Sequence, residues 1–272
     1  MKSIKLFYFS PTGTTEKIVK ATGNKILEHS PENIKLEIMN FTLPGNREIM
    51  PSFSEDDLVI VGVPVYAGRV PNVLLNYLNN IKGNGALAVA IVLYGNRNYD
   101  DALIELRDIL IKAEFKVIAA GAFIGEHSFS KTLAKGRPNN LDLEKARDFG
   151  EKIFNKISIS SKEIGNFYIK GNPDYSKYYV PLGKEGKPAD IRKVVPKTNT
   201  NCTDCKICAE VCPMASISFD DVTQITGICI KCCACIKKCP ENAKYFDDEN
   251  YIIHKEDLEK KYIKRKEPEF FI

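Results

Sequence analysis

Residues 202–240 read CTDCKICAEVCPMASISFDDVTQITGICIKCCACIKKCP, and this stretch organises the C-terminal part of the chain. All nine cysteines of the protein lie in it. Eight of them form two copies of C-x2-C-x2-C-x3-C-P, the second beginning at Cys229, 27 residues after Cys202. Within each copy, three thiolates at two-residue gaps can surround three corners of an iron–sulfur cube. The fourth corner must be supplied from elsewhere in the chain.

Two other uses of cysteine fit this stretch less well. Structural zinc sites usually combine two C-x2-C pairs, or cysteine with histidine, across a spacer of roughly 12–20 residues. A third cysteine in each group, followed by Cys-Pro, departs from that pattern. A disulfide framework requires an oxidising compartment, and the opening MKSIKLFYFSPTG has no signal-peptide pattern. The spacing therefore favours two 4Fe-4S clusters.

The cysteine stretch resembles the bacterial two-cluster ferredoxins. In that family, the cysteine before the proline binds the cluster of the opposite motif. The resemblance therefore implies one cluster on Cys202, Cys205, Cys208 and Cys239, and a second on Cys229, Cys232, Cys235 and Cys212. The ninth cysteine, Cys233, is outside the pattern. We expect it to be a small buried hydrophobe, with tuning of a cluster through its sulfur as the alternative.

Length and composition place this stretch in a larger globular protein. A length of 272 residues predicts two domains, since a domain usually has roughly 100–200 residues. The hydrophobic content of 44% is ordinary for a globular protein. The longest apolar runs, at 58–63 and 87–94, are far shorter than the ~20 residues of a membrane span. We therefore expect a cytoplasmic protein that does not bind membranes.

Short, nearly continuous apolar runs alternate with stretches of helical periodicity over residues 1–157. The apolar runs lie at 4–9, 34–39, 58–63, 87–94 and 116–123, and the helical stretches at 14–29, 70–81, 99–113 and 141–157. Continuous hydrophobicity is typical of strands covered on both faces, as in a parallel sheet. The pattern predicts a doubly wound α/β fold with five parallel strands. Ligands of such folds bind beyond the carboxyl ends of the strands.

The first predicted strand ends in the loop Ser10-Pro11-Thr12-Gly13-Thr14-Thr15. Hydroxyl groups, a glycine and the free N–H groups of the following helix can bind a phosphate. The loop contains no lysine, and both the Walker pattern G-x4-G-K-[ST] and the Rossmann pattern G-x-G-x-x-G are missing. Nucleoside triphosphates are therefore disfavoured. A simple helix N-cap is the alternative to a phosphate site.

The third and fourth predicted strands end in loops that combine aromatic residues with glycine. The loop at 64–71 places Tyr66 beside a small residue and a glycine. A tyrosine ring there can lie on a planar heterocycle or pack on the protein. Arg69 of the same loop is expected to be exposed and solvated. The loop at 94–100 reads YGNRNYD, in which Asp100 can also serve as a helix N-cap.

These three loops, in this order and at these strand ends, resemble those of the flavodoxin family. The resemblance implies that the first loop holds the phosphate of FMN and the second packs on the isoalloxazine ring. It also implies that the third bonds the pyrimidine edge and covers the second face of the ring. The implied FMN-binding residues are Ser10, Thr12, Gly13, Thr14, Thr15, Pro64, Val65, Tyr66, Ala67, Gly68, Tyr94, Gly95, Asn96, Arg97 and Tyr99. Residues 1–157 are slightly basic, whereas short-chain flavodoxins are strongly acidic.

A polar loop after the fifth predicted strand contains His127. Because the unperturbed pKa of histidine is near neutrality, His127 beside a flavin can donate a proton or contact a substrate. It is the candidate catalytic residue. A loop histidine satisfied by hydrogen bonds is the simpler interpretation, and its neighbours Glu126 and Ser128 are weaker candidates.

The remaining segments are a connector, a small domain and a tail. Residues 158–200 lose apolar periodicity and are rich in Gly, Pro, Lys and Tyr, which predicts a connector. Its tyrosines can lie over the flavin, against the cluster domain, or in ordinary packing. Residues 201–247 are expected to form a small α+β ferredoxin-like domain. In the tail, 248–272, a charged helix-compatible piece at 254–266 precedes two phenylalanines that fold back or form an association surface.

The net charge of +4 gives no support to nucleic-acid binding. The excess of basic residues lies mainly in residues 158–200, which hold eight Lys and Arg against four Asp and Glu. Thiolate-bound clusters and a flavin phosphate would add negative charge to the protein. No basic stripe with interleaved aromatic residues is present, so we expect no nucleic-acid partner.

The whole arrangement resembles the fused flavodoxin-ferredoxin proteins of anaerobic bacteria and archaea. The resemblance implies an intracellular electron-transfer protein that moves electrons between FMN and two 4Fe-4S clusters. A redox partner protein of ferredoxin type would supply or accept these electrons. The alternative is an FMN-dependent oxidoreductase that reduces a small molecule at the flavin with electrons fed through the clusters. The sequence leaves open the direction of electron flow and the oligomeric state, a homodimer included.

Overall fold

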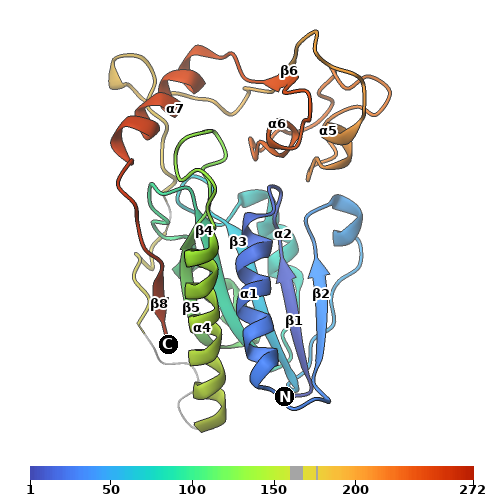
Figure 1. Cartoon of the computed structure of the whole chain (residues 1–272), viewed down its shortest axis with the longest axis vertical. Coiled ribbons are helices and arrows are strands. Elements are labelled where there is room, and N and C mark those ends of the chain that lie inside the picture. The colour runs from blue at the N-terminus through green and yellow to red at the C-terminus, as the bar shows by residue number, and fades with distance from the viewer. Residues whose placement is uncertain (160–167, 176) are drawn as a thin grey trace.

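A parallel sheet forms the centre of the molecule. The computed structural model describes residues 1–159, 168–175 and 177–272. Five parallel strands follow the order β2-β1-β3-β4-β5. They are β1 Ser3–Tyr8, β2 Lys35–Asn40, β3 Asp57–Pro64, β4 Leu87–Tyr94 and β5 Lys116–Ile124 (Figure 1). This order is that of the flavodoxin-like doubly wound fold. The prediction of a mostly parallel α/β sheet is confirmed.

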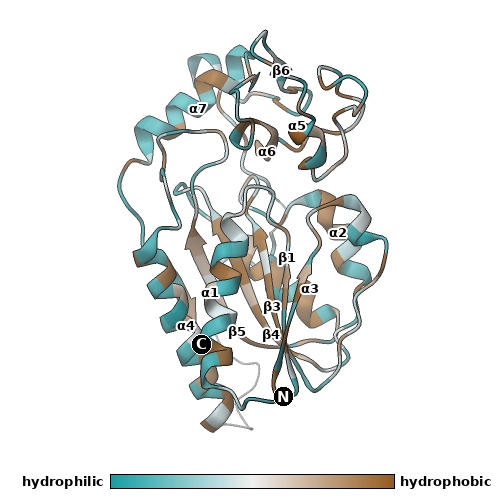
Figure 2. Cartoon of the chain, turned by 45° about the vertical axis from the view of Figure 1, so that its right-hand side comes forward, coloured by the Kyte–Doolittle hydropathy of each residue, from teal (hydrophilic) through white to brown (hydrophobic). Residues whose placement is uncertain are grey.

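Two helices cover each face of the sheet. α1 Thr14–His29 and α4 Asn140–Ile159 pack together on one face, and α2 Asn72–Asn80 and α3 Ala102–Lys112 cover the other. Gly150 lets α4 approach α1 closely, because a Cβ there would lie 2.5 Å from the carbonyl oxygen of Thr22. Figure 2 shows the apolar residues concentrated in the strands. The two apolar layers on either side of the sheet therefore form the core of this sheet domain, residues 1–159.

The prediction of five strands is wrong by one, because the end of the chain returns to the sheet. β8, Glu269–Phe271, pairs antiparallel with β5 and places Phe270 opposite Gly121. The ring of Phe270 stacks on Phe149 of α4 with 4.8 Å between the ring centroids. Without β8, β5 would be an exposed edge of the sheet, and natural proteins usually protect such edges.

Further helices lie in a loop of the sheet domain, in the connector and in the tail. A 3₁₀ helix, η1 Pro44–Arg47, follows β2, and η2 Lys184–Gly186 lies in the connector. After the cysteine-rich region (residues 201–247), α7 Glu249–Lys261 begins earlier than the helix-compatible piece at 254–266 suggested. Asp248 explains this start, because its side chain accepts a hydrogen bond from the N–H of Tyr251 at 2.9 Å. In the part of the chain that the structure describes, every helix is too short or too polar to cross a membrane.

The cysteine-rich region repeats in its backbone as it does in its sequence. α5 Ile207–Glu210 and α6 Ala234–Lys237 are related by the same 27-residue offset as the two motifs. A residue with left-handed backbone precedes each helix, Lys206 at φ 63° and Cys233 at φ 60°. Cys233 therefore occupies the position of Lys206 in the second copy, which is why it lies outside the ligand pattern. Antiparallel pairing of β6 Lys197–Thr198 with β7 Lys244–Tyr245 closes the region.

Candidate functional site

The first strand-end loop leaves the N-terminus of α1 open. Gly13 has a left-handed backbone, φ 83°, and α1 has no side-chain cap bond at this end. Ser10 Oγ instead accepts a hydrogen bond from the N–H of Glu16 at 3.0 Å. The hydroxyls of Thr12 and Thr14 lie 3.4 Å apart, and a Cβ on Gly13 would meet nothing within 4 Å. Thr15 is buried under the loop. The arrangement presents helix N–H groups and hydroxyls to open space, as an anion site requires.

The second loop is a tight turn at the end of β3. The backbones of Tyr66 and Arg69 exchange two hydrogen bonds of 3.0 Å. Ala67 and Gly68 between them have positive φ angles, 49° and 77°, which is the geometry of a type I′ turn. The N–H of Tyr179 donates to the carbonyl of Ala67 at 2.8 Å, so the connector lies against the turn. The loop therefore holds the partly exposed Tyr66 on a rigid support.

The residues on either side of this turn are fixed by the core. Pro64 ends β3, and the N–H of Val65 donates to the carbonyl of Leu93 at 2.7 Å. The expectation that Arg69 is exposed is wrong, because the side chain is buried. Its Nε and Nη2 donate to the two carboxylate oxygens of Glu105 at 2.7 and 2.5 Å. These hydrogen bonds raise the pKa of Arg69. Its charge is neutralised inside the protein and is not available to a ligand.

The third loop does not present all of its predicted residues. Tyr94 and Tyr99 are buried in the core between the sheet and α3, and their ring centroids lie 5.5 Å apart. The hydroxyl of Tyr99 donates to Glu269 of β8 at 3.0 Å. Gly95 lies against His127, since a Cβ at Gly95 would be 2.4 Å from His127 Cδ2. Of the three tyrosines predicted to bind the flavin, Tyr66 is therefore the most exposed, because Tyr94 and Tyr99 are buried.

Asn96 and Arg97 of the third loop are held by the tail and the connector. Asn96 Nδ2 donates to the carbonyls of Tyr262 and Lys264 at 2.6 and 3.0 Å. Its Oδ1 is buried and has no hydrogen-bond partner among the described residues. Arg97 pairs with Asp100, and its guanidinium lies 4.0 Å from the ring centroid of Tyr179. Asn96 Oδ1 is therefore an acceptor that lacks a donor.

His127 makes two hydrogen bonds within its own loop. Its ring Nδ1 accepts a hydrogen bond from the backbone N–H of Phe129 at 3.2 Å. The backbone N–H of His127 donates to the carbonyl of Leu133 at 3.1 Å. Burial lowers the pKa of His127 to about 3, with smaller contributions from the positive charges of His254 and Lys237. The ring is therefore neutral near pH 7 and supplies no imidazolium proton there.

The eight motif cysteines line two separate cavities. The first cysteine site is lined by Cys202, Cys205, Cys208 and Cys239, and the second by Cys212, Cys229, Cys232 and Cys235. Each site combines three cysteines of one motif with the pre-proline cysteine of the other. Within residues 1–159, 168–175 and 177–272, no three His, Cys, Asp or Glu side chains form a group that could hold a metal ion. The four cysteines of each set instead surround a cavity.

Backbone groups and burial define the chemistry of these sulfurs. The N–H of Ser216 donates to Cys212 Sγ at 3.4 Å, and 27 residues later the N–H of Ala243 donates to Cys239 Sγ at 3.2 Å. Burial raises the pKa of four thiols, those of Cys208, Cys229, Cys232 and Cys235. A buried thiolate at these positions therefore needs a compensating positive charge.

Cys233 borders the second cysteine site, and its sulfur contacts groups other than the motif cysteines. Its Sγ lies 3.7 Å from the hydroxyl of Tyr251 and 3.4 Å from the carbonyl of Lys231. The side chain is buried, and burial raises its pKa to about 12. This placement agrees with the expected small buried hydrophobe.

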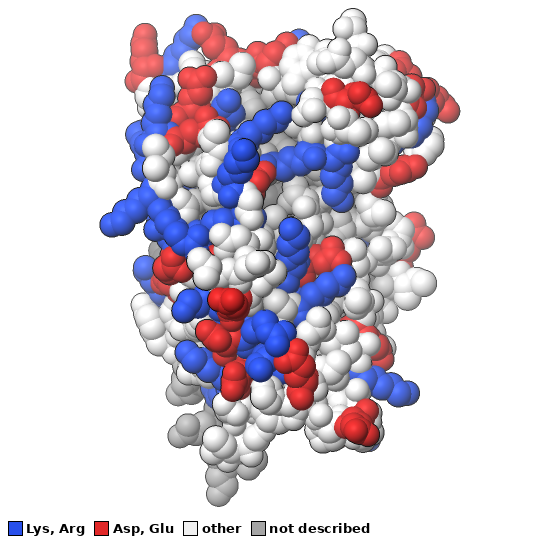
Figure 3. Space-filling view, viewed as in Figure 1, with Lys and Arg blue, Asp and Glu red and all other residues white. Residues whose placement is uncertain are grey.

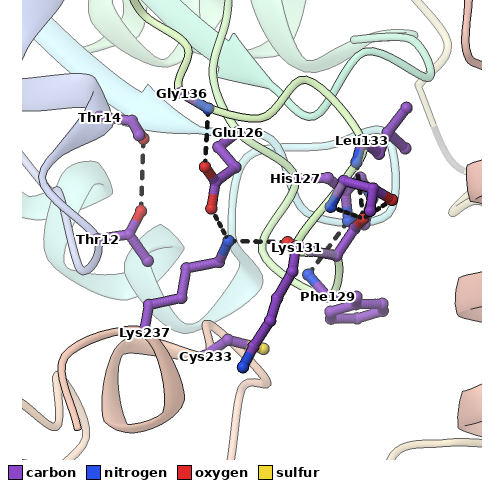
Figure 4. Close-up of polar contacts among 12 residues, drawn as sticks. Thr12, Thr14, Glu126, His127, Phe129, Lys131, Leu133, Gly136, Cys233 and Lys237 are labelled. Atoms are coloured by element: carbon purple, nitrogen blue, oxygen red, sulfur yellow. Dashed lines mark hydrogen bonds and ion pairs between the residues drawn. The ribbon is translucent and has the colours of Figure 1, made fainter. Parts of the chain in front are cut away.

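The cysteine-rich region lies across the strand-end loops. Lys237 of α6 pairs with Glu126 and donates to the carbonyl of Ser130 at 2.9 Å (Figure 4). A Cβ on Gly125 would lie 3.2 Å from Cβ of Thr14, so this loop also touches the first loop. Figure 3 shows Lys and Arg side chains gathered where the cysteine-rich region meets the sheet domain. The three strand-end loops and the cysteine sites therefore face one another.

Three residues that shape these sites were not among the candidates. Glu105 neutralises Arg69, Tyr179 covers the second loop, and Lys237 joins the two regions. The regular spacing of the cysteines gives no sign that Lys237 meets Glu126, which is 111 residues away. Only the tyrosine-rich composition of the connector hinted at Tyr179.

Comparisons with known proteins give the chain a distant structural likeness. No protein-family model and no curated protein matches it. A flavodoxin from the domain Archaea is 18% identical and covers 58% of this chain and 99% of its own, with a TM-score of 0.40. An NADH:FMN oxidoreductase in its apo form is 17% identical, and the match covers 60% of this chain and 92% of the oxidoreductase, with a TM-score of 0.41. A Fusobacterium nucleatum flavodoxin bound to flavin mononucleotide is 18% identical, with 57% and 99% covered and a TM-score of 0.38.

Proposed function

We propose that the protein carries FMN at its strand-end loops and two 4Fe-4S clusters in its cysteine-rich region, and transfers electrons between them and a redox partner protein. The main support is the distribution of the eight motif cysteines around two cavities. Each cavity is lined by three cysteines of one motif and one cysteine of the other. Such an interlocked set is the ligand arrangement of two-cluster ferredoxins. A flavin exchanges one or two electrons, whereas each cluster exchanges one.

The donor set of each cavity fits an iron–sulfur cluster. Four cysteine sulfurs are the usual ligands of a 4Fe-4S cluster. A bound cluster would provide the positive iron charge that the buried thiols need as thiolates. The N–H groups that point at Cys212 and Cys239 would remain on the ligated sulfurs, where such hydrogen bonds contribute to the reduction potential. Cys233 would not be a ligand, because its sulfur contacts Tyr251.

The strand-end loops fit FMN at both ends of that molecule. The open N-terminus of α1, with Thr12, Gly13 and Thr14, would hold the phosphate through N–H groups and hydroxyls. Asn96 Oδ1 is a buried acceptor without a donor, and the N–H edge of a flavin pyrimidine can supply one. Tyr66 would support the ring. The buried Tyr94 and Tyr99 would position the third loop from below instead of contacting the cofactor.

The chain's own residues would orient the cofactor and exclude water from it. The type I′ turn fixes Tyr66, and Tyr179 closes over the turn and over Arg97. The neutral ring of His127 packs beside Gly95 and offers no imidazolium proton near pH 7. These features suit electron exchange, in which the protein sets orientation and environment.

Anaerobic purification with flavin, iron and sulfide counts tests this function. We expect one FMN and about eight irons for each chain after reconstitution. Markedly fewer irons in fully reconstituted protein would refute the two-cluster assignment. Cys239→Ser should lose the cluster of the first cysteine site, while the matched control Cys233→Ser should keep both clusters. Loss of iron in Cys233→Ser as large as in Cys239→Ser would contradict the ligand assignment.

A further inference from the structure

The second cysteine site borders the loop that holds Tyr66. Ile230, between two ligands of this site, packs against the apolar core on the α2 and α3 face of the sheet, as does Val65. Val65 directly precedes Tyr66 in the second loop. The second motif and the loop that carries Tyr66 therefore rest on the same apolar layer.

Polar contacts fix the second cysteine site against the sheet domain. Arg47 of η1 donates through Nη2 to the carbonyl of Pro213 at 2.7 Å, and Pro213 directly follows Cys212. Lys237 pairs with Glu126 two residues after Cys235. Burial alone would raise the pKa of Glu126, but the hydrogen bond from Lys237 lowers it. The segments that carry this site are therefore anchored from two different strand-end loops.

The first cysteine site borders solvent. Of its four cysteines, Cys205 is exposed and only Cys208 is buried, whereas two of the four in the second site are buried, Cys232 and Cys235, and none is exposed. The site is also lined by Thr203 and Glu241, whose side chains are exposed. In Figures 1 and 2, β6, which lies just before this site in the chain, is at the end of the molecule away from the sheet.

We propose that the two sites are in series, with the second cysteine site next to the flavin and the first cysteine site as the terminal where electrons enter or leave the protein. The partner at this terminal is a one-electron redox protein that approaches the face carrying Cys205. The inference rests on the proposed function and adds to it the order of the cofactors.

Along this series, the two electrons of a reduced flavin would be matched by two one-electron transfers to the partner. Two electrons from a bound, reduced flavin would pass one at a time through the site of Cys212, Cys229, Cys232 and Cys235 and then through that of Cys202, Cys205, Cys208 and Cys239, to two molecules of the one-electron partner. The protons of the reduced flavin would go to solvent. In the opposite direction the same steps run in reverse, with two partner molecules oxidised for each flavin reduced.

Stepwise removal of iron from the intact holoprotein tests the order. An iron chelator is added under anaerobic conditions, and the cysteines set free are alkylated and identified by mass spectrometry. We expect the first four of the eight irons to leave the first cysteine site, so that Cys202, Cys205, Cys208 and Cys239 are alkylated first. Alkylation of the other four cysteines first, or of both sets at one rate, overturns the order. A protein that never holds eight irons fails the proposed function instead.

Two cysteine variants test the position of the flavin by absorbance. In Cys205→Ser, photoreduced flavin should still bleach the remaining cluster at the wild-type rate, while reduction of an added one-electron carrier protein slows about tenfold or more. In Cys232→Ser, the exchange between flavin and the remaining cluster should itself slow by about tenfold or more. The reverse pattern overturns the proposal. If Cys205→Ser fails to fold, the half-depleted wild-type protein from the chelation experiment replaces it. If Cys232→Ser fails to fold, Cys229→Ser, at another ligand of the same site, replaces it.

Discussion

The sheet domain and the cysteine-rich region are stabilised in different ways. Apolar side chains from the strands and from α1 to α4 fill two continuous layers of the sheet domain. The buried cluster of the cysteine-rich region consists of Cys208, Ala209, Ile217, Val222 and Cys235, of which two are motif cysteines. Hydrophobic burial can stabilise the first region without a cofactor. The second has a much smaller apolar cluster, so we expect its stability to depend on the clusters proposed for its cysteines.

If the protein carries the cofactors proposed above, this difference predicts that cofactor loading and folding are separate events in the sheet domain and a single event in the cysteine-rich region. A metal site that forms only in the folded state contributes its binding free energy to folding. We therefore expect the sheet to form first and the cysteine-rich region to become ordered with its clusters. The predictions below test that contrast, from the largest expected effect to the smallest.

Removing all iron should unfold the cysteine-rich region and leave the sheet intact. Amide hydrogen exchange followed by mass spectrometry should show loss of protection over 201–240. The strands at 57–64 and 87–94 should stay protected, because their hydrogen bonds lie between two apolar layers. Unchanged protection over 201–240 in iron-free protein would show that this region folds without its clusters.

Glu105→Ala should strongly destabilise the sheet domain. The substitution leaves the buried guanidinium of Arg69 and the N–H of Val70 without their acceptor. Breaking a buried ion pair in this way costs about 3–5 kcal/mol in the free energy of unfolding, measured by urea denaturation. The matched control on the same helix, Asp108→Ala, removes a more exposed pair with Arg107 and should cost less than about 1 kcal/mol. Equal losses in the two variants would contradict the assignment.

Acid should destabilise the sheet domain through His127. The pKa of His127 is about 3 in the folded protein and near 6.5 when unfolded, so only the unfolded state binds the proton between these values. Stability is therefore full above pH 6.5 and falls as the pH drops, by about 2 kcal/mol at pH 5 for this group. In His127→Gln this contribution should be missing from the pH dependence of urea unfolding. If the free energy of unfolding of that variant depends on pH as it does in the wild type, another group is responsible for the acid sensitivity.

Lys237→Ala should weaken the contact between the two regions only modestly. The variant loses the pair with Glu126 and the bond to the carbonyl of Ser130, both partly buried. We expect a loss of about 1 kcal/mol, read from thermal unfolding of the holoprotein. Lys131→Ala is the control, because its bond to Asn242 is exposed. If both variants match the wild type, the contact contributes nothing to stability.

Much of the sheet domain could be predicted from the sequence because its signals are local. The five apolar runs agree with the parallel strands to within about one residue at each end. Four of these strands are largely buried, and strands covered on both faces are apolar throughout, whereas β2 at the sheet edge is mostly exposed. The same continuity hides which face each side chain takes. For that reason the burial of Tyr94 could not be predicted, although its place at the end of β4 could.

Contacts between segments far apart in the chain could not be predicted from the sequence pattern. β8 is only three residues long and shows no alternation, so its pairing with β5 has no local signal. The meeting of Lys237 with Glu126 depends on how the cysteine-rich region is placed, which no spacing encodes. The sorting of cysteines into two crossed sets was expected only through the likeness to ferredoxins, and the ligand roles remain a prediction.

The return of the chain to the sheet as β8 changes the topology of the whole molecule. Because the final strand belongs to the same sheet as the first, the cysteine-rich region is an insertion in the sheet domain, tethered at both of its ends. A module on a single flexible linker samples many distances from its neighbour. One tethered at both ends and bound through Lys237 to Glu126 samples few, so cofactors held in the two regions as proposed would keep a nearly constant separation and orientation.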